Sequence, residues 1–228
     1  MLDTALKESG DSDEFLEIKD YARQVGLTIQ PVDRPRLSSI LGDINHQGVA
    51  LRTGPYPYVD LDDILSAVRD DPASTVVILD HIEDPQNVGS ILRTADAAGV
   101  CGVIIPEDRA ACVSPAAVRA SAGASEHMNV AKVVNLVRAI EKLKEAECWI
   151  TALDFGDDAR NYTDIDFTGR CAIVIGNEGS GVGRLVRENS DFVAMLPMMG
   201  EVSSLNAGVA GGIALYEVLR QKGVKAGC

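Results

Sequence analysis

The sequence predicts an α/β protein with a mainly parallel sheet in its larger, C-terminal part and a smaller α/β domain before it. Continuous apolar runs, typical of strands buried on both faces, occur at TVVILD (75–80), GVIIP (102–106) and CAIVIG (171–176). Segments with helical spacing of apolar residues separate these runs, and such alternation indicates a parallel sheet. We expect the boundary near residue 73, which gives domains 1–73 and 74–228.

In the smaller domain, apolar residues at Phe15, Ile18 and Tyr21 predict a helix, and GLTIQPV predicts a strand after it. A short helix is expected at 37–41, a strand in QGVALRT (47–53), and a bridging helix in LDDILSAVRDD just before the boundary. The first thirteen residues are polar, and we expect them to be frayed.

In the larger domain, helices are expected through Ala98, near 114–123 and in the amphipathic stretch 135–147. CWITALDF (148–155) and FVAMLPM (192–198) predict further strands. Ligands of parallel sheets bind at the carboxyl ends of the strands. The segments that follow Asp80, Leu153, Ile175 and Leu196 are therefore the candidates for a site.

The composition narrows the class of protein. Of 228 residues, 46% are hydrophobic and 24% charged, which is ordinary for a globular protein. No run approaches the roughly 18 apolar residues of a membrane span, and the acidic N-terminus does not resemble a signal peptide. Five cysteines without a CxxC pair indicate reduced thiols in a cytoplasm. We expect all but the terminal Cys228 to be small core residues. Three scattered histidines predict no metal site. The net charge of −13 argues against nonspecific nucleic-acid binding.

The first candidate segment is DHIEDPQNVGSILRTADAAGV (80–100). Asn87 is a candidate N-cap of the helix that follows the strand. Arg93 lies off the apolar stripe of that helix, so it forms either a surface pair with Asp96 or a grip on a phosphate. Spacing alone slightly favours the surface pair.

The second segment, IVIGNEGSGVGRLV (173–186), places a glycine-rich loop directly after a buried strand. It fits neither G-x-G-x-x-G, because Arg184 occupies the last glycine position, nor the phosphate-binding P-loop, because no Lys-Ser/Thr follows. Glu178 would repel an anion, so the loop favours a neutral or cationic ligand group. A solvated turn glutamate is an equally good interpretation.

The third segment is LPMMGEVSSLNAGVA (196–210). Ser203, Ser204 and Asn206 lie where a helix begins, either as caps or as part of a site. That helix contains Gly208, Gly211 and Gly212, although each interior glycine costs about 1 kcal/mol relative to alanine.

Together the three segments resemble, in order and spacing, the signature motifs of the SpoU/TrmH family of RNA ribose 2′-O-methyltransferases in the SPOUT superfamily. The resemblance runs from about Ile78 to Arg220. INHQGVAL (44–51), PEDRAA (106–111) and SAGASEH (121–127) are similar to the RlmB-like subgroup, which methylates a guanosine of 23S ribosomal RNA.

The resemblance implies a trefoil-knot methyltransferase domain that binds S-adenosylmethionine and works as a cytoplasmic homodimer. It also implies an RNA-binding N-terminal domain similar to ribosomal protein L30e, here apparently incomplete because the family's opening strand is absent before Asp11. The three glycines would let the last helix approach a threaded loop or a partner subunit closely.

The resemblance also implies roles for individual residues. The cofactor-binding positions are Gly176, Asn177, Glu178, Gly179, Leu196, Met198, Ser204 and Leu205. The catalytic positions are Arg93, Asn87, Glu178, Ser204 and Asn206. Arginine has a pKa above about 12 and is a poor general base, so we expect Arg93 to bind an RNA phosphate and orient the hydroxyl. Asn87 would hold the loop and Arg93, and Glu178 would face a positive charge, either Arg93 or the sulfonium.

Three alternatives remain. The motifs are shared with transfer RNA ribose methyltransferases. A non-catalytic cofactor-binding assembly factor is disfavoured by the intact motif residues, and a nicotinamide dehydrogenase by the failed dinucleotide pattern. If RNA is the substrate, a local basic track is expected from Arg34, Arg36, Arg52, Arg93, Arg109, Arg119, Arg184 and Arg187.

Overall fold

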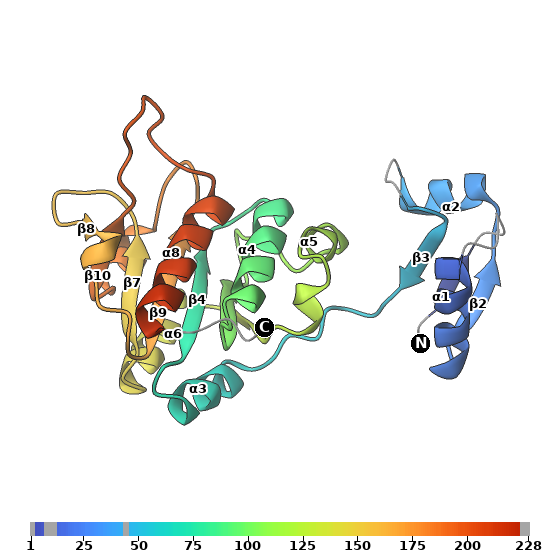
Figure 1. Ribbon diagram of the computed structural model, residues 1–228, viewed down its shortest axis with the longest axis horizontal. Helices are drawn as coiled ribbons and strands as arrows, with labels where there is room; N and C mark the ends of the chain where they lie inside the picture. The colour runs from blue at the N-terminus through green and yellow to red at the C-terminus, as the bar shows by residue number, and fades with distance from the viewer. Residues whose placement is uncertain (1–2, 7–12, 43–45, 224–228) are drawn as a thin grey trace. The chain divides into compact units, whose positions relative to one another are not determined.

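The larger part of the chain is built on a seven-stranded sheet in which all the strands are parallel. The computed structural model describes residues 3–6, 13–42 and 46–223 (Figure 1). The sheet order is β6-β5-β4-β9-β7-β10-β8. The strands are β4 (Thr75–Asp80), β5 (Gly102–Pro106), β6 (Val130–Val133), β7 (Trp149–Leu153), β8 (Arg160–Asn161), β9 (Cys171–Gly176) and β10 (Phe192–Met195). The predicted parallel α/β architecture is confirmed.

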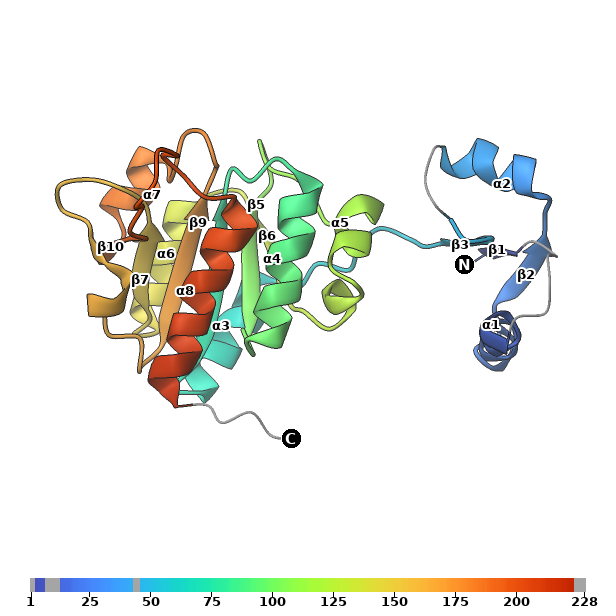
Figure 2. The same cartoon turned by 45° about the horizontal axis from the view of Figure 1, so that its top comes forward.

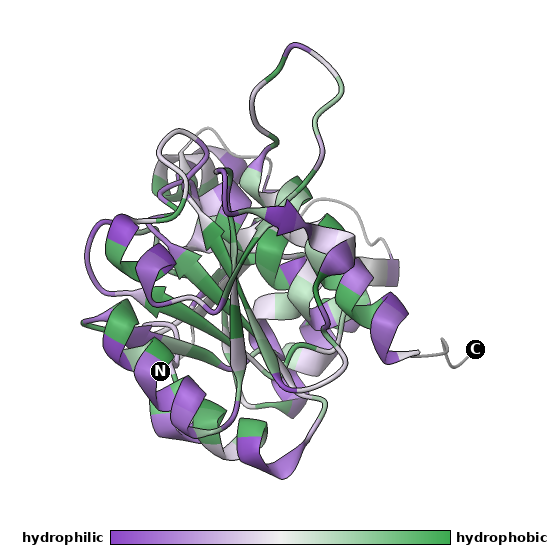
Figure 3. Cartoon of the chain, turned by 90° about the vertical axis from the view of Figure 1, so that its left-hand side faces the viewer, coloured by the Kyte–Doolittle hydropathy of each residue, from purple (hydrophilic) through white to green (hydrophobic). Residues whose placement is uncertain are grey.

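Helices cover both faces of this sheet (Figure 2). One face bears α4 (Pro85–Ala97), α5 (Pro115–Ala120) and α8 (Ala207–Lys222), and the other bears α3 (Leu61–Asp70), α6 (Leu136–Glu145) and α7 (Arg184–Glu188). Two short 3-10 turns complete this part, η1 (Ala124–Glu126) and η2 (Tyr162–Asp164). Apolar residues concentrate in the strands, and polar residues line the outer faces of the helices (Figure 3). The buried strands explain why the apolar runs are continuous.

The register brings four strand ends to one edge of the sheet. Asp80 at the end of β4 pairs with Gly176 at the end of β9, and Leu153 at the end of β7 pairs with Ile175. Leu153 also pairs with Ala194 in β10. The loops that follow these strands therefore emerge side by side, as expected for the candidate segments.

Close packing explains the presence of two of the three glycines in α8. A Cβ added at Gly211 would lie 2.5 Å from Ile175 Cδ1 on β9, and one at Gly208 would lie 2.9 Å from Ser90 Oγ on α4. The nearest atom to a Cβ at Gly212 is 3.7 Å away, an ordinary contact. Gly208 and Gly211 thus permit the close approach of α8 to its neighbours, and nothing in the structure explains Gly212.

The chain divides into two units, 1–57 and 58–228. This division falls before α3, whereas the sequence predicts a boundary in or just after this helix, near residue 73. Helix α3 buries Ile64, Leu65 and Val68, and these side chains belong to the core cluster of the second unit. Its apolar face, which resembled that of a bridging helix, therefore packs into the larger unit.

The N-terminal unit contains a three-stranded sheet of order β2-β1-β3. Its strands are β1 (Asp3–Leu6), β2 (Thr28–Pro31) and β3 (Val49–Arg52), and its helices are α1 (Asp13–Gln24) and α2 (Arg34–Leu41). Strand β1 corrects two expectations, that residues 1–13 are frayed and that no opening strand precedes Asp11. It pairs in parallel with β2 and antiparallel with β3. Residues 7–12 and the start of INHQGVAL, Ile44 and Asn45, lie outside the described residues.

The cysteines follow the prediction only in part. All four described cysteines are free: Cys148 and Cys171 are buried, Cys101 is partly buried and Cys112 is exposed, which corrects its assignment to the core. Burial raises the pKa of Cys101 to about 11 and raises the pKa values of Cys148 and Cys171 as well. Cys228 lies outside the described residues.

Candidate cofactor and catalytic site

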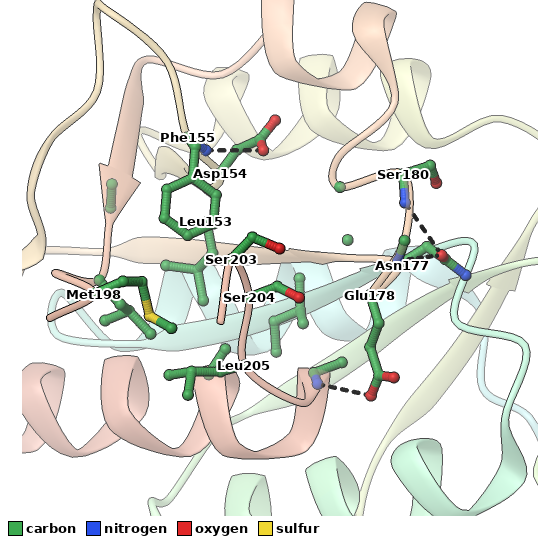
Figure 4. A pocket seen from close by; sticks show the side chains of 18 residues that line it. Leu153, Asp154, Phe155, Asn177, Glu178, Ser180, Met198, Ser203, Ser204 and Leu205 are labelled. Carbon is green, nitrogen blue, oxygen red and sulfur yellow. Dashed lines mark hydrogen bonds between the residues drawn. The ribbon is translucent and has the colours of Figure 1, made fainter. Parts of the chain in front are cut away.

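A cavity of about 290 Å³ opens at the carboxyl ends of β7, β9 and β10 (Figure 4). Three loops form its walls: the residues after β7, the glycine-rich loop after β9, and the segment that joins β10 to α8. It is lined by Leu153, Asp154, Phe155, Ile175, Gly176, Asn177, Glu178, Gly179, Ser180, Gly181, Ala194, Leu196, Met198, Ser203, Ser204, Leu205, Ala207 and Ala210. The second and third candidate segments therefore share one cavity.

The glycine-rich loop folds tightly back on itself. Asn177 and Gly181 exchange two backbone hydrogen bonds of 3.0 and 2.8 Å, and Asn177 Oδ1 accepts from the Gly179 backbone N–H at 2.9 Å. A Cβ added at Gly176 would lie 2.3 Å from the carbonyl carbon of Gly181, and Gly181 has a positive φ of 67°. Because backbone fills the space beside Gly176, no other residue fits there.

Residues at the end of β4 hold both ends of this loop. The buried Asp80 Oδ2 accepts from the Gly183 N–H at 2.6 Å, and the His81 carbonyl accepts from Asn177 Nδ2 at 3.0 Å. His81 has a left-handed φ of 57°, and its Nδ1 lies 2.5 Å from Asp80 Oδ1. The conformation of the loop is thus fixed from β4 as well as from within.

Three distant segments meet around Glu178 at the edge of the cavity. Glu178 Oε1 accepts hydrogen bonds from Asn87 Nδ2 at 2.9 Å, Asn206 Nδ2 at 2.6 Å and the Ala207 N–H at 3.1 Å. Asn206 Nδ2 also donates to Asn87 Oδ1 at 2.7 Å. We call Asn87, Glu178 and Asn206 the junction. It joins the first turn of α4, the glycine-rich loop and the start of α8.

The local roles of the two asparagines differ from each other. Asn206 caps α8, because its Oδ1 accepts from the Gly208 and Val209 N–H groups at 3.0 and 3.2 Å. Asn87 is not an N-cap, as the sequence suggested: Asp84 caps α4 through the Gln86 N–H at 2.9 Å, and Pro85 occupies the first turn. Asn87 is therefore inside the helix, buried, and free to reach Glu178.

Arg93 lies elsewhere on α4, exposed and outside the cavity lining. Among the residues that the structure describes, it forms no ion pair, so neither the surface pair with Asp96 nor a contact with Glu178 is present. In the expected arginine track, Arg184 pairs with Glu188 and Arg187 pairs with Asp154 and Asp158. Those two guanidinium groups are therefore already engaged by acids.

The residues that form the cavity wall after β7 were not identified individually from the sequence. Asp154 accepts the Phe155 N–H at 2.9 Å and lies 3.4 Å from Arg187 Nε. The Arg187 guanidinium lowers the pKa of Asp158, which in turn raises the pKa of Arg187. The position of the segment at a strand end was the only signal for Asp154 and Phe155. For Asp80, which the fold buries beside the loop, the end of a predicted strand was likewise the only signal.

The described residues show neither a metal-binding cluster nor a membrane-spanning helix. No group of three or more histidine, cysteine, aspartate or glutamate side chains there is arranged to hold a metal ion. No helix there combines the length and apolar character that crossing a bilayer requires.

The arrangement as a whole belongs to a known class of methyltransferase folds. The structure of the SpoU methyltransferase AviRb from Streptomyces viridochromogenes is similar, with a TM-score of 0.80 and 26% identity, over 96% of this chain and 81% of that one. AviRb has also been solved in complex with the cofactor AdoMet. An rRNA methyltransferase from Sinorhizobium meliloti gives a TM-score of 0.77 at 26% identity, over 96% and 79% of the two chains.

The chain belongs to the SpoU rRNA Methylase family, whose profile matches residues 74–216. A second profile, RNA 2′-O ribose methyltransferase substrate binding, matches residues 4–59. A putative TrmH family tRNA/rRNA methyltransferase of Staphylococcus haemolyticus is 44% identical over 207 residues, covering 90% of this chain and 82% of its own length. The putative TrmH family tRNA/rRNA methyltransferase YacO of Bacillus subtilis is 42% identical over 207 residues, which also cover 90% of this chain and 82% of its own length.

Proposed function

We propose that this chain transfers a methyl group from S-adenosylmethionine to the 2′-hydroxyl of a guanosine ribose in 23S ribosomal RNA. The observation that most supports it is the junction. Asn87, Glu178 and Asn206 come from three signature segments far apart in the sequence, and hydrogen bonds of 2.6–2.9 Å join them beside one cavity. Members of this family are RNA 2′-O-ribose methyltransferases, and we propose guanosine of 23S ribosomal RNA as the target of this one.

S-adenosylmethionine is the cofactor, and the cavity suits it. Ile175, Leu196 and Leu205 supply apolar surface for an adenine ring, and the backbone of Gly176 and Gly179 lines the same cavity. The carboxylates of Asp154 and Glu178 complement a positive charge. Met198, Asn177 and Ser204 complete the proposed cofactor contacts. When bound, the cofactor supplies a methyl group activated by a positively charged sulfur.

The protein's part in the reaction is positioning. Methyl transfer requires the ribose oxygen, the methyl carbon and the sulfur in line, and such alignment is worth roughly 7–11 kcal/mol. Arg93 is exposed and without an ion pair among the described residues, so its guanidinium is available to an RNA phosphate. We propose that Arg93 binds that phosphate and orients the hydroxyl. The junction holds the first turn of the same helix at the cavity edge.

Two observations favour ribosomal over transfer RNA. The rRNA methyltransferase of Sinorhizobium meliloti resembles 96% of this chain, whereas the tRNA modifying enzyme of A. aeolicus, at a TM-score of 0.62 and 29% identity, resembles 72%. The segments HQG, PEDRAA and SAGASEH are similar to the guanosine-specific subgroup. A ribosomal RNA substrate and the free thiols together support a cytoplasmic location.

We also propose that the protein works as a homodimer through α8. Val209, Ile213 and Tyr216 repeat at helical spacing on one face and are 51%, 37% and 56% exposed. Ala207 and Ala210, at the beginning of the same helix, line the cavity from another side of α8, so a partner subunit on this helix would lie close to the cofactor. The threading of α8 through a trefoil knot belongs to the same proposal, supported by the close contacts of Gly208 and Gly211.

The test uses the purified protein, tritiated S-adenosylmethionine and two RNAs from cells that lack the enzyme, protein-free 23S ribosomal RNA and bulk transfer RNA. Label in the ribosomal RNA alone is expected. Label in transfer RNA alone would retain the chemistry and replace the substrate. Cofactor binding without label in either RNA would favour the non-catalytic assembly factor.

A further inference from the structure

The charged residues that line the cavity are all acidic. Asp154 comes from the residues after β7 and Glu178 from the loop after β9, on opposite sides of the cavity (Figure 4). Among the described lining residues there is no lysine, arginine or histidine. The interior of the cavity is therefore acidic.

Asp154 is the better placed of the two carboxylates to act on a ligand's charge. Its side chain is 19% exposed, so its field is less screened than that of a surface group. Its only cationic neighbour, among the described side chains, is Arg187, at 3.4 Å, and Arg187 also bonds to the more exposed Asp158. One guanidinium thus serves two carboxylates, which leaves a net negative charge at this wall.

Glu178 is already committed to other partners. Its Oε1 accepts three hydrogen bonds, one of them from the Ala207 N–H at the beginning of α8. The N-terminus of a helix has a partial positive charge, which offsets the carboxylate. Glu178 therefore contributes less than Asp154 to the net charge that a ligand meets.

Gly181 brings the Asp154 carboxylate against the cofactor loop. Gly181 has a positive φ of 67°, and a Cβ there would lie 2.8 Å from Asp154 Oδ1. A side chain at this position would displace the carboxylate. The glycine therefore allows the Asp154 carboxylate to pack against the glycine-rich loop, which we propose binds the cofactor.

The proposed reaction changes the charge of the cofactor. The carbon–sulfur bond breaks with its electron pair staying on sulfur, a carbon–oxygen bond forms, and the hydroxyl proton passes to solvent water. A sulfonium of charge +1 becomes a neutral thioether, while the adenosine and amino-acid parts stay the same. We propose that Asp154 is the residue by which the cavity distinguishes S-adenosylmethionine from S-adenosylhomocysteine, and so favours exchange of product for fresh cofactor. This inference rests on the proposed function.

The experiment is isothermal titration of the full chain with each of the two compounds, without RNA. The wild type is expected to bind S-adenosylmethionine more tightly. Asp154→Asn, which keeps the shape, should weaken that binding about tenfold and change the affinity for S-adenosylhomocysteine less than about threefold. Glu188→Gln is the matched control, because it removes one negative charge from α7 without touching the cavity lining.

A second variant moves the preference in the opposite direction. Arg187→Gln removes the cation beside Asp154, so it should increase the ratio of the two affinities, and it keeps the test valid if Asp154→Asn does not fold. Equal weakening of both compounds by Asp154→Asn, or an unchanged ratio in both variants, would overturn the inference. A wild type that binds neither compound would instead overturn the proposed cofactor.

Discussion

Substitution of Asn206 by aspartate tests the junction with a change of one atom. Asn206 Oδ1 caps α8, while its Nδ2 donates to Asn87 and Glu178 at 2.7 and 2.6 Å. Asn206→Asp keeps the cap, since aspartate is as good an N-cap as asparagine. It replaces the donor with an acceptor that faces the Glu178 carboxylate. Any loss of stability therefore reports on the junction and not on the cap.

The expected loss follows from the contacts. Two hydrogen bonds are lost, at about 1 kcal/mol each. Repulsion between two carboxylates in contact at a partly solvated site adds about 1–2 kcal/mol. The negative charge at the beginning of α8 returns about 0.5 kcal/mol. The free energy of unfolding should therefore fall by about 3 kcal/mol at pH 8.

The loss should depend on pH with a definite sign. In the folded variant the introduced carboxyl group lies beside another carboxylate, so it retains its proton to higher pH than in the unfolded chain. The folded state then binds more protons, and the stability of the variant relative to wild type rises as the pH falls. The difference should shrink between pH 8 and about pH 5.

Urea unfolding at both pH values measures these quantities. Asn135→Asp is the control, because Asn135 caps α6 through the Arg138 N–H at 3.1 Å in the same way. This control should stay within about 0.5 kcal/mol of wild type. If Asn206→Asp is equally neutral, or its loss is independent of pH, the junction does not stabilise the protein as argued.

Three further predictions concern the cofactor, the RNA and the dimer. Gly176→Ala should abolish binding of S-adenosylmethionine, because its Cβ would meet the backbone at 2.3 Å; Gly179→Ala, with 3.5 Å of room, should retain binding in the same titration. Arg93→Ala should lower kcat for methyl incorporation at least 100-fold and leave the cofactor affinity by titration unchanged. Arg138→Ala, on α6 at the opposite face of the sheet, should change neither quantity. Tyr216→Glu should convert a dimer into a folded monomer, because it places a charge on the exposed face of α8; light scattering measures the mass. A persistent dimer would exclude this face of α8 as the dimer interface.

The sequence predicts five of the seven strands of the large sheet and misses β6 and β8, which have four and two residues. The most recognisable strands are buried on both faces. The runs at β4, β5 and β9 are continuous for that reason. Their order is a different matter. Strand β9 lies between β4 and β7 in the sheet, although it follows both of them in the chain. No local sequence pattern encodes this position.

Elements held mainly by backbone pairing were missed. Strand β1 has only four residues, DTAL, and its polar character predicted fraying. Its hydrogen bonds to β2 and β3 come from segments more than twenty residues away. At α4, by contrast, a local signal existed: the Asp84-Pro85 pair marks the cap, and it is a stronger helix start than Asn87.

The candidate site required more than the sequence pattern supplied. Helix and strand signals placed the three segments at strand ends, and the family resemblance selected Asn87, Glu178 and Asn206 within them. The contact between Asn87 and Glu178 spans 91 residues, so only the fold brings them together. The contacts of Asp154 and Asp80 with the glycine-rich loop came from the structure alone, because a single aspartate at or just after a strand end has no distinctive local signature.

The most direct test of the proposed function is to locate the methyl group. After reaction of the wild-type protein with tritiated S-adenosylmethionine and unmodified 23S ribosomal RNA, the RNA is hydrolysed with alkali, which cannot cleave beside a methylated 2′-oxygen. We predict that the label appears in an alkali-resistant dinucleotide whose methylated residue is guanosine. Label on a base, released in ordinary mononucleotides, would contradict ribose methylation.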